Sequence, residues 1–111
     1  MTNKKIPFSP PDITEAEINE VIEVMKSGWI TSGPKVAKFE ENIAKYCETN
    51  HAVAVSSATA GMELVLKCLG VGEGDEVITT PYTYASTSNV ILHRGAKPVF
   101  VDVEKDSFLI D

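Results

Sequence analysis

The chain is organised around one stretch, Ala52-Val53-Ala54-Val55-Ser56-Ser57-Ala58-Thr59-Ala60-Gly61-Met62. Its opening apolar run has no polar alternation, which predicts a parallel strand over residues 51–55 that is buried on both faces. The Ser and Thr residues that follow can cap free backbone N–H groups, so a helix is expected from about Thr59 to Leu69. This helix is apolar almost all round, and we expect it to be buried. Such a strand–turn–helix directs several N–H donors and a helix dipole at one point, where an anion, most often a phosphate, is stabilised.

The same turn has a simpler explanation. Small residues occur at strand–helix turns because the packing there is tight, and Ser or Thr can cap a helix without binding any ligand. The stretch alone therefore leaves phosphate binding and plain helix capping open.

Composition restricts the class of protein. The 111 residues suffice for one modest domain, and 43% hydrophobic with 23% charged residues is typical of a soluble globular protein. The net charge of −6 argues against a nucleic-acid surface, which needs clustered Lys and Arg. No apolar run approaches the roughly 20 residues of a membrane span, and no secretory signal is visible. We expect a cytoplasmic protein without nucleic-acid or membrane partners.

Cysteine and histidine usage predicts neither a disulfide nor a metal site. Cys47 and Cys68 fall in two different predicted helices, and we expect reduced thiols there. His51 and His93 each stand alone, and an isolated histidine is more often structural than a metal ligand.

The N-terminal segment is predicted to contain an arm and two helices. The Pro-rich residues 1–13 should be extended. Thr14 and Glu17 form a capping box that starts the first helix, and Gly28 ends it. After a loop, Pro34 suits the first turn of the second helix. The apolar stripes are Ile18, Val21, Ile22 and Met25 on the first helix, and Val36, Phe39, Ile43, Tyr46 and Cys47 on the second.

Strands and helices alternate through the rest of the chain, which predicts βαβ units and a parallel sheet. Further strands are expected over residues 76–79 and 98–102, with a helix over 85–93 between them. The Gly70-x-Gly72-x-Gly74 pattern resembles a dinucleotide-binding loop, but it follows a helix and precedes a strand. A phosphate loop needs the reverse order. We interpret it as a tight helix-to-strand connection.

Ligands of parallel α/β sheets bind beyond the carboxyl ends of the strands. Three loops are expected at that edge: residues 56–59, residues 80–84 and the segment from Asp102 onward. The second loop carries Tyr82 and Tyr84. A tyrosine ring there can stack on a planar heterocycle that bears the phosphate, or it can pack against a neighbouring helix. Both interpretations remain open from the residues alone.

A set of motifs in a fixed order resembles one family. The motifs are Pro7-Phe8-Ser9, Ser27–Pro34, Phe39-Glu40, Ala54–Gly61, Gly72–Ile78, Thr83–Thr87 and Gly95–Asp102. Together they resemble the DegT-type nucleotide-sugar aminotransferases, which depend on pyridoxal 5'-phosphate (PLP). The resemblance implies an α/β fold: the N-terminal part of the fold-type I large domain, a mostly parallel sheet with flanking helices. Within the family, Ser56–Met62 and Gly28–Lys35 are most similar to the enzymes that make UDP-4-amino-4-deoxy-L-arabinose.

The resemblance also implies roles for individual residues. Ala58, Thr59 and Ala60 match the cup that holds the cofactor phosphate, Thr59 through its hydroxyl and Ala60 through its backbone N–H. Tyr84 matches the aromatic residue that stacks on the pyridine ring, where some relatives carry Trp or Phe. The positions that match the surroundings of the sugar substrate are Phe8, Trp29, Ile30, Thr31, Ser32 and Ser57.

No catalytic residue is assigned within residues 1–111, because the Schiff-base lysine of the family lies further along the chain. Lys67 is expected inside a helix and Lys97 at the start of a strand, and neither context is equivalent. Residues 1–34 should form the arm, first helix and substrate loop, and residues 35–111 the first part of an incomplete PLP-binding large domain. The uncovered apolar C-terminus also leads us to expect a longer protein.

The implied reaction is transamination of a keto-sugar nucleotide, with glutamate as amino donor and a homodimer whose active sites lie at the subunit boundary. Two alternatives remain. The first is a sugar dehydratase of the same fold, since some relatives carry His at the lysine position and dehydrate sugars with PLP or its amine form. The residue at the lysine position distinguishes the two reactions, and it is outside the chain. The second alternative is a truncated, non-catalytic product. The intact phosphate cup and Tyr84 argue against it, because a protein that does not bind the cofactor has no need of either.

Overall fold

The structure, a computed structural model, describes residues 6–111, so the first five residues of the predicted arm lie outside the described part. The chain divides into two compact units, one ending at Ala54 and one running from Val55 to Asp111. Each unit is described by itself.

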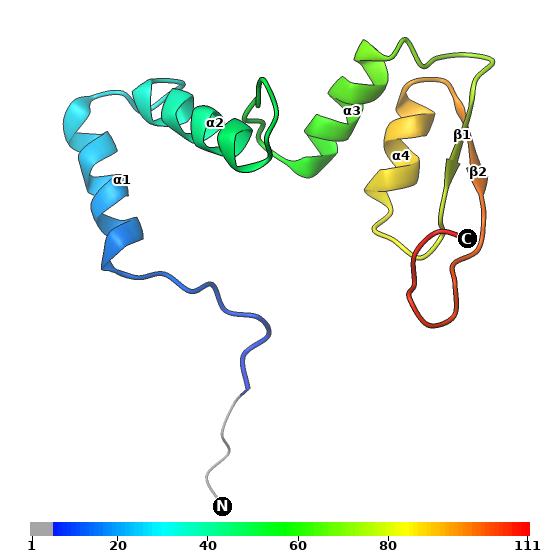
Figure 1. Cartoon of the computed structure of the whole chain (residues 1–111), viewed down its shortest axis with the longest axis horizontal. Helices are drawn as coiled ribbons and strands as arrows, with labels where there is room; N and C mark the ends of the chain where they lie inside the picture. The colour runs from blue at the N-terminus through cyan, green and yellow to red at the C-terminus, as the bar shows by residue number, and fades with distance from the viewer. Residues whose placement is uncertain (1–5) are drawn as a thin grey trace, which may run out of the picture. The chain divides into compact units, whose positions relative to one another are not determined.

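The first unit contains two helices, α1 (Glu15–Ser27) and α2 (Pro34–Tyr46), which follow the N-terminal arm in Figure 1. The predicted capping box is confirmed, since the Thr14 hydroxyl accepts from the Ala16 N–H and the Glu17 carboxylate accepts from the Thr14 N–H. Gly28 ends α1 in the left-handed conformation, at φ 76°, where a glycine carries no steric cost. The predicted start of α2 at Pro34 is likewise confirmed.

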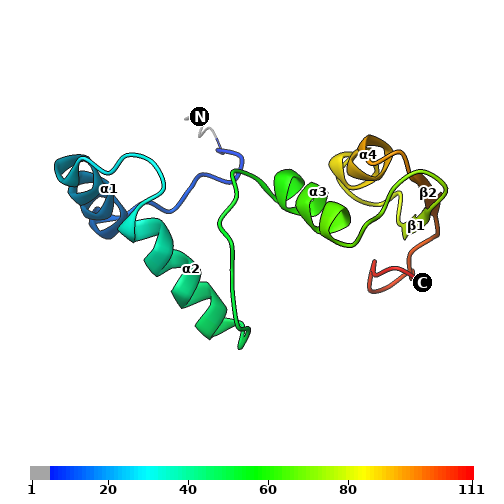
Figure 2. The same cartoon turned by 90° about the horizontal axis from the view of Figure 1, so that it is seen from above.

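The second unit contains α3 (Ala58–Cys68), β1 (Glu76–Thr79), α4 (Ser86–His93) and β2 (Lys97–Phe100). The two strands are parallel and in register from Glu76 opposite Lys97 to Thr79 opposite Phe100. Figures 1 and 2 show α4 beside this pair, as a βαβ unit requires. The small core of this unit consists of Thr79, Val90, Ile91 and Ala96.

The glycine-rich connection between α3 and β1 is a tight turn. The segment from Gly70 to Asp75 joins the end of α3 to β1, and it closes with a bond from the Asp75 N–H to the Gly72 carbonyl. The Asp75 carboxylate also accepts from the Gly72 N–H at 2.8 Å. This pattern is a turn held by its own residues, so the interpretation as a tight helix-to-strand connection is confirmed.

The predicted strand over residues 51–55 is wrong for the part of the chain that the structure describes, where this segment is extended but unpaired. Val53 is 76% exposed. A strand exists only through hydrogen bonds to a neighbouring strand, and residues 6–111 supply none for this segment. The Ala54 N–H instead donates to the Glu40 carboxylate at 2.8 Å.

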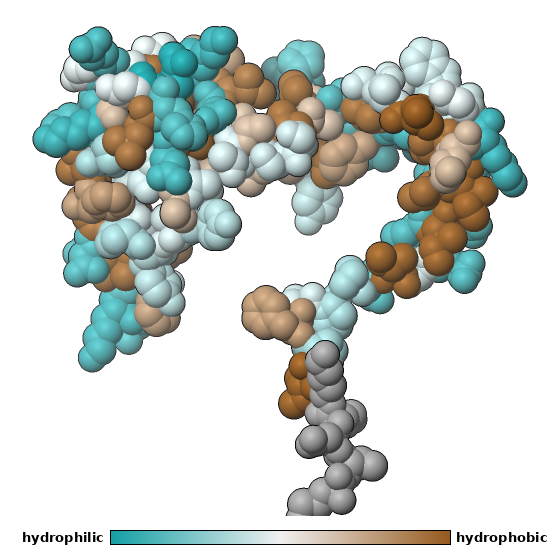
Figure 3. All heavy atoms as spheres, turned by 180° about the vertical axis from the view of Figure 1, so that it is seen from behind, coloured by the Kyte–Doolittle hydropathy of each residue, from teal (hydrophilic) through white to brown (hydrophobic). Residues whose placement is uncertain are grey.

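The prediction that the helix after this segment is buried all round is also wrong within residues 6–111. No residue of α3 is buried, and Leu64 and Val65 are about half exposed. The apolar stripe of α1 is exposed as well, and it contributes to the brown surface in Figure 3. Periodicity identifies an apolar face but says nothing of the segment that covers it.

Candidate functional site

The N-terminus of α3 is closed by the side chain of Ser57, the residue before the helix. Its hydroxyl accepts a hydrogen bond from the Ala60 N–H at 3.1 Å, while its carbonyl accepts from the Gly61 N–H at 3.1 Å. Ser57 therefore serves as a helix cap in this structure. Its predicted place near a sugar substrate stays a prediction.

The neighbouring donors at this helix end are free. Among the described residues, neither the Ala58 and Thr59 N–H groups nor the Thr59 hydroxyl has a hydrogen-bond partner. A helix N-terminus with two open N–H groups and a hydroxyl suits the oxygens of a phosphate. Of the predicted cup, Ala58 and Thr59 can bind an anion directly, whereas the Ala60 N–H would have to be shared with Ser57.

The two tyrosines after β1 have different surroundings. The ring of Tyr82 stacks on Phe108, with centroids 5.3 Å apart and an interplanar angle of 27°. Its packing partner is thus the C-terminal segment, where Val103 and Ile110 form an antiparallel bridge, and not a helix. Tyr84 is 81% exposed. Its ring remains accessible to a ligand, as stacking on a cofactor requires, and its predicted role stays a prediction.

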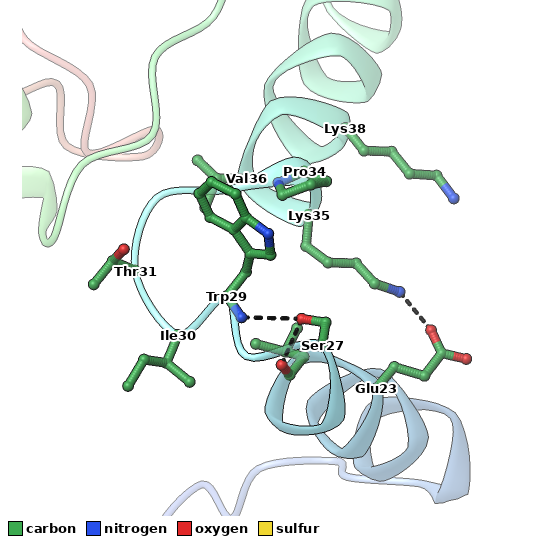
Figure 4. A pocket seen from close by; sticks show the side chains of 11 residues that line it. Glu23, Ser27, Trp29, Ile30, Thr31, Pro34, Lys35, Val36 and Lys38 are labelled. Carbon is green, nitrogen blue, oxygen red and sulfur yellow. Dashed lines mark hydrogen bonds and ion pairs between the residues drawn. The ribbon is translucent and has the colours of Figure 1, made fainter.

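The loop between α1 and α2 borders a pocket of about 570 Å³. Figure 4 shows the Trp29 indole in this pocket beside Pro34, with Ile30 and Thr31 on the outer side of the loop. Trp29 is 58% exposed, and Ile30, Thr31 and Ser32 are exposed as well. The side chains at the tip of the loop are therefore available for a ligand.

The predicted site residues fall into two groups. Ser57, Ala58, Thr59, Ala60 and Tyr84 lie in the second unit, while Phe8 and the loop 29–32 lie in the first. Phe8 is fully exposed, and it packs against no described residue.

The sequence analysis did not predict the contacts of two charged residues of the first unit, Lys35 and Glu40. The Lys35 ammonium contacts the carboxylates of Glu20 and Glu23, the latter at 2.7 Å. These bonds raise the pKa of Lys35, and the bond from Lys35 lowers the pKa of Glu23. Glu40 is the second, through its bond to the Ala54 N–H. Only the acidic pair three residues apart on one helix face could have signalled the first contact.

Lys67 and Lys97 lie in regular secondary structure. Lys67 lies within α3, as predicted. Lys97 begins β2 and contacts the Glu76 carboxylate of the adjacent strand at 2.7 Å, a bond that raises the pKa of Lys97. Within residues 6–111 no group of three His, Cys, Asp or Glu residues could hold a metal ion, and none of the helices there is long and apolar enough to cross a membrane.

The profile of the DegT/DnrJ/EryC1/StrS aminotransferase family matches residues 11–111. This match extends over most of the chain, from the arm before α1 to the C-terminal bridge. The chain belongs to the DegT/DnrJ/EryC1/StrS aminotransferase family. The family predicted from the ordered motifs is thereby confirmed.

Similar members of the DegT/DnrJ/EryC1/StrS family include biosynthetic proteins of bacteria. The chain is 53% identical over its whole length to the UDP-4-amino-4-deoxy-L-arabinose–oxoglutarate aminotransferase of Shewanella sediminis, and covers 29% of that protein. It is 50% identical over 98% of its length to the spore coat polysaccharide biosynthesis protein SpsC of Bacillus subtilis, and covers 28% of it. The chain thus spans less than a third of the length of these relatives.

A solved structure with the same fold is Spr1654 of Streptococcus pneumoniae, whose proposed assignment is sugar aminotransferase. Its PLP form has a TM-score of 0.90 and 53% identity, over 96% of this chain and 27% of that protein. Its pyridoxamine phosphate form matches with a TM-score of 0.91. The predicted fold class is confirmed by this similarity, and the two cofactor forms of Spr1654 agree with the predicted cofactor.

Proposed function

We propose that this chain is part of a PLP-dependent aminotransferase that transfers the amino group of glutamate to a keto-sugar nucleotide. The observation that carries the proposal is the open N-terminus of α3. There the hydroxyl of Thr59 and the N–H groups of Ala58 and Thr59 lack partners among residues 6–111. Membership of the DegT/DnrJ/EryC1/StrS family supplies the reaction class.

The residues present fit the cofactor in charge and shape. Ala58, Thr59 and Ala60 would hold its phosphate at the positive end of the helix dipole. Tyr84 would stack on its ring, because that side chain is accessible and planar. When bound, PLP supplies an electron sink for the bonds made and broken during amino transfer.

The sugar nucleotide is the second ligand of the proposal. We assign its recognition to Phe8, to the loop from Trp29 to Ser32 and to Ser57. The support is that the loop side chains are exposed beside a pocket, and that Phe8 is unpacked within the described residues. We propose a nucleotide sugar as a class of substrate, because the UDP-4-amino-4-deoxy-L-arabinose–oxoglutarate aminotransferase and the spore coat polysaccharide biosynthesis protein are about equally similar to this chain.

The organisation of the whole protein is also a proposal. Residues 1–34 would form an arm, a helix and a substrate loop, and residues 35–111 the first part of the PLP-binding large domain. We further propose a cytoplasmic homodimer with active sites at the subunit boundary. The many exposed apolar side chains of α1 and α3 support the presence of further covering segments.

The test is reduction of the full-length protein with borohydride in the presence of PLP, followed by intact-mass and peptide mapping. We expect one pyridoxyl adduct on a lysine outside residues 1–111, and glutamate-dependent amination of a keto-sugar nucleotide. A long protein without an adduct would favour the alternative dehydratase type, in which His replaces the lysine. A protein of 12.0 kDa without an adduct would favour the non-catalytic product and contradict the proposal.

A further inference from the structure

The loop between α1 and α2 is held at its start by the last turn of α1. The Ser27 hydroxyl donates to the Val24 carbonyl at 2.7 Å and accepts from the Trp29 N–H at 3.2 Å. Figure 4 shows these two bonds at the end of the helix. The first residue of the loop therefore cannot swing away from α1 without losing a hydrogen bond.

The other end of the loop is held by Lys35, in the first turn of α2. Its ammonium group reaches back to Glu20 and Glu23, which lie three residues apart and share one face of α1. One cation thus joins the start of α2 to the middle of α1. The bridge therefore restrains the direction in which the chain enters α2.

The interior of the loop is closely packed. A Cβ atom added at Gly33 would lie 3.0 Å from Cε3 of the Trp29 indole, so the indole rests directly on this glycine. Since Gly33 precedes α2, any rotation of that helix would displace the Trp29 ring.

We propose that Lys35 is a positioning residue for sugar-nucleotide recognition, which acts by fixing the loop from Trp29 to Ser32 through its bridge to Glu20 and Glu23. The inference rests on the proposed function of that loop. In this role Lys35 acts through the loop and needs no contact with the substrate, since its ammonium group is already paired with the Glu20 and Glu23 carboxylates. It orders the loop before the ligand arrives, which lowers the entropy lost on binding.

The test uses the full-length enzyme loaded with PLP and compares its two half-reactions. In Lys35→Met we expect the KM for the sugar nucleotide to rise roughly three- to tenfold, in line with the loss of an exposed ion-pair network. The kcat and the glutamate half-reaction should stay within about twofold of wild type. Lys35→Arg should retain a KM near wild type, and Lys45→Met, which removes an exposed lysine at the far end of α2, is the matched control.

A charge exchange separates positioning from direct binding. Lys35→Glu combined with Glu20→Lys and Glu23→Lys rebuilds the bridge with reversed signs, and we expect it to restore the KM that Lys35→Glu alone raises. Added NaCl should raise the KM of wild type toward that of Lys35→Met, whose own KM should respond less. Failure of the exchange to restore KM in a protein with wild-type melting temperature would overturn the inference.

One further variant keeps this inference distinct from the proposed function. If Trp29→Ala leaves the KM for the sugar nucleotide unchanged, the assignment of the substrate loop is wrong, and the role of Lys35 in recognition is lost with it. If Trp29→Ala raises that KM while Lys35→Met does not, the proposed function stands and the inference about Lys35 alone is overturned.

Discussion

At the scale of single residues, the chain uses hydroxyl side chains at helix starts in two ways. Thr14 closes the start of α1 together with Glu17, and Ser57 closes the start of α3. Thr59, the second residue of α3, keeps its hydroxyl free of partners within residues 6–111. A hydroxyl that the helix does not need is the one available to a ligand.

We predict that Thr59→Val weakens the binding of PLP to the full-length protein. The substitution preserves the shape of the side chain but removes a hydrogen bond to a charged phosphate, worth about 1.5–3 kcal/mol. The dissociation constant of PLP, measured by fluorescence titration, should therefore rise about 10- to 100-fold. Thr59→Ser is the control and should bind nearly as wild type. Unchanged affinity in Thr59→Val would argue against the phosphate cup.

A second residue-scale prediction concerns the capping box of α1. The hydroxyl and N–H of Thr14 both donate to the Glu17 carboxylate and lower its pKa below the ordinary value near 4.5. A lowered pKa means that the carboxylate stabilises α1 above pH 4.5 and loses this effect as pH falls through the pKa in the folded state. In Thr14→Ala, an NMR titration of Glu17 should give a higher pKa, whereas Thr14→Ser should keep it low.

At the scale of elements, α4 organises the second unit. It connects the two parallel strands and contributes Val90 and Ile91 to the core, while the following Leu92 is 56% exposed. Ile91 is buried and the next residue, Leu92, is exposed, because successive side chains of a helix point about 100° apart around its axis.

We predict that Ile91→Ala lowers the free energy of unfolding of the full-length protein by about 2–5 kcal/mol, because it leaves a cavity in the core. Leu92→Ala is the matched control, and it should cost much less unless a segment outside residues 6–111 covers that side chain. Urea unfolding followed by circular dichroism measures both. An effect of Ile91→Ala below about 1 kcal/mol would contradict the placement of α4 on the sheet.

At the scale of the whole molecule, the two units bury little apolar surface. The buried hydrophobic residues of the described chain are Ala44, Val90, Ile91 and Ala96. Such a core is small against the conformational entropy lost when a chain of this length folds. In the longer protein proposed above, we therefore expect apolar contacts with further segments to contribute much of the stability of these units.

We predict that residues 1–111, expressed alone, bind the dye ANS and unfold without a cooperative transition. In the full-length protein, the amides of α1 and α3 should gain strong protection against hydrogen exchange, because their apolar faces are then covered. Thermal unfolding by circular dichroism and exchange measured by mass spectrometry test the two statements. A sharp, reversible transition of the isolated chain would contradict the first.

Local sequence by itself determined where most elements begin and what class of fold they build. The capping box at Thr14, the proline at the start of α2 and the alternation around α4 were predicted because each depends on neighbours within a few residues. The ordered motifs also predicted the family, since each one occupies its own position along the chain.

Only the tertiary structure decided which distant groups meet. The extended segment 51–55 lacks the predicted strand pairing, and Glu40 binds its Ala54 N–H instead. Tyr82 stacks on Phe108, and Lys35 bridges to two carboxylates of α1. Hydrogen-bond partners and burial come from segments far away in the chain, so patterns of a few residues cannot specify them.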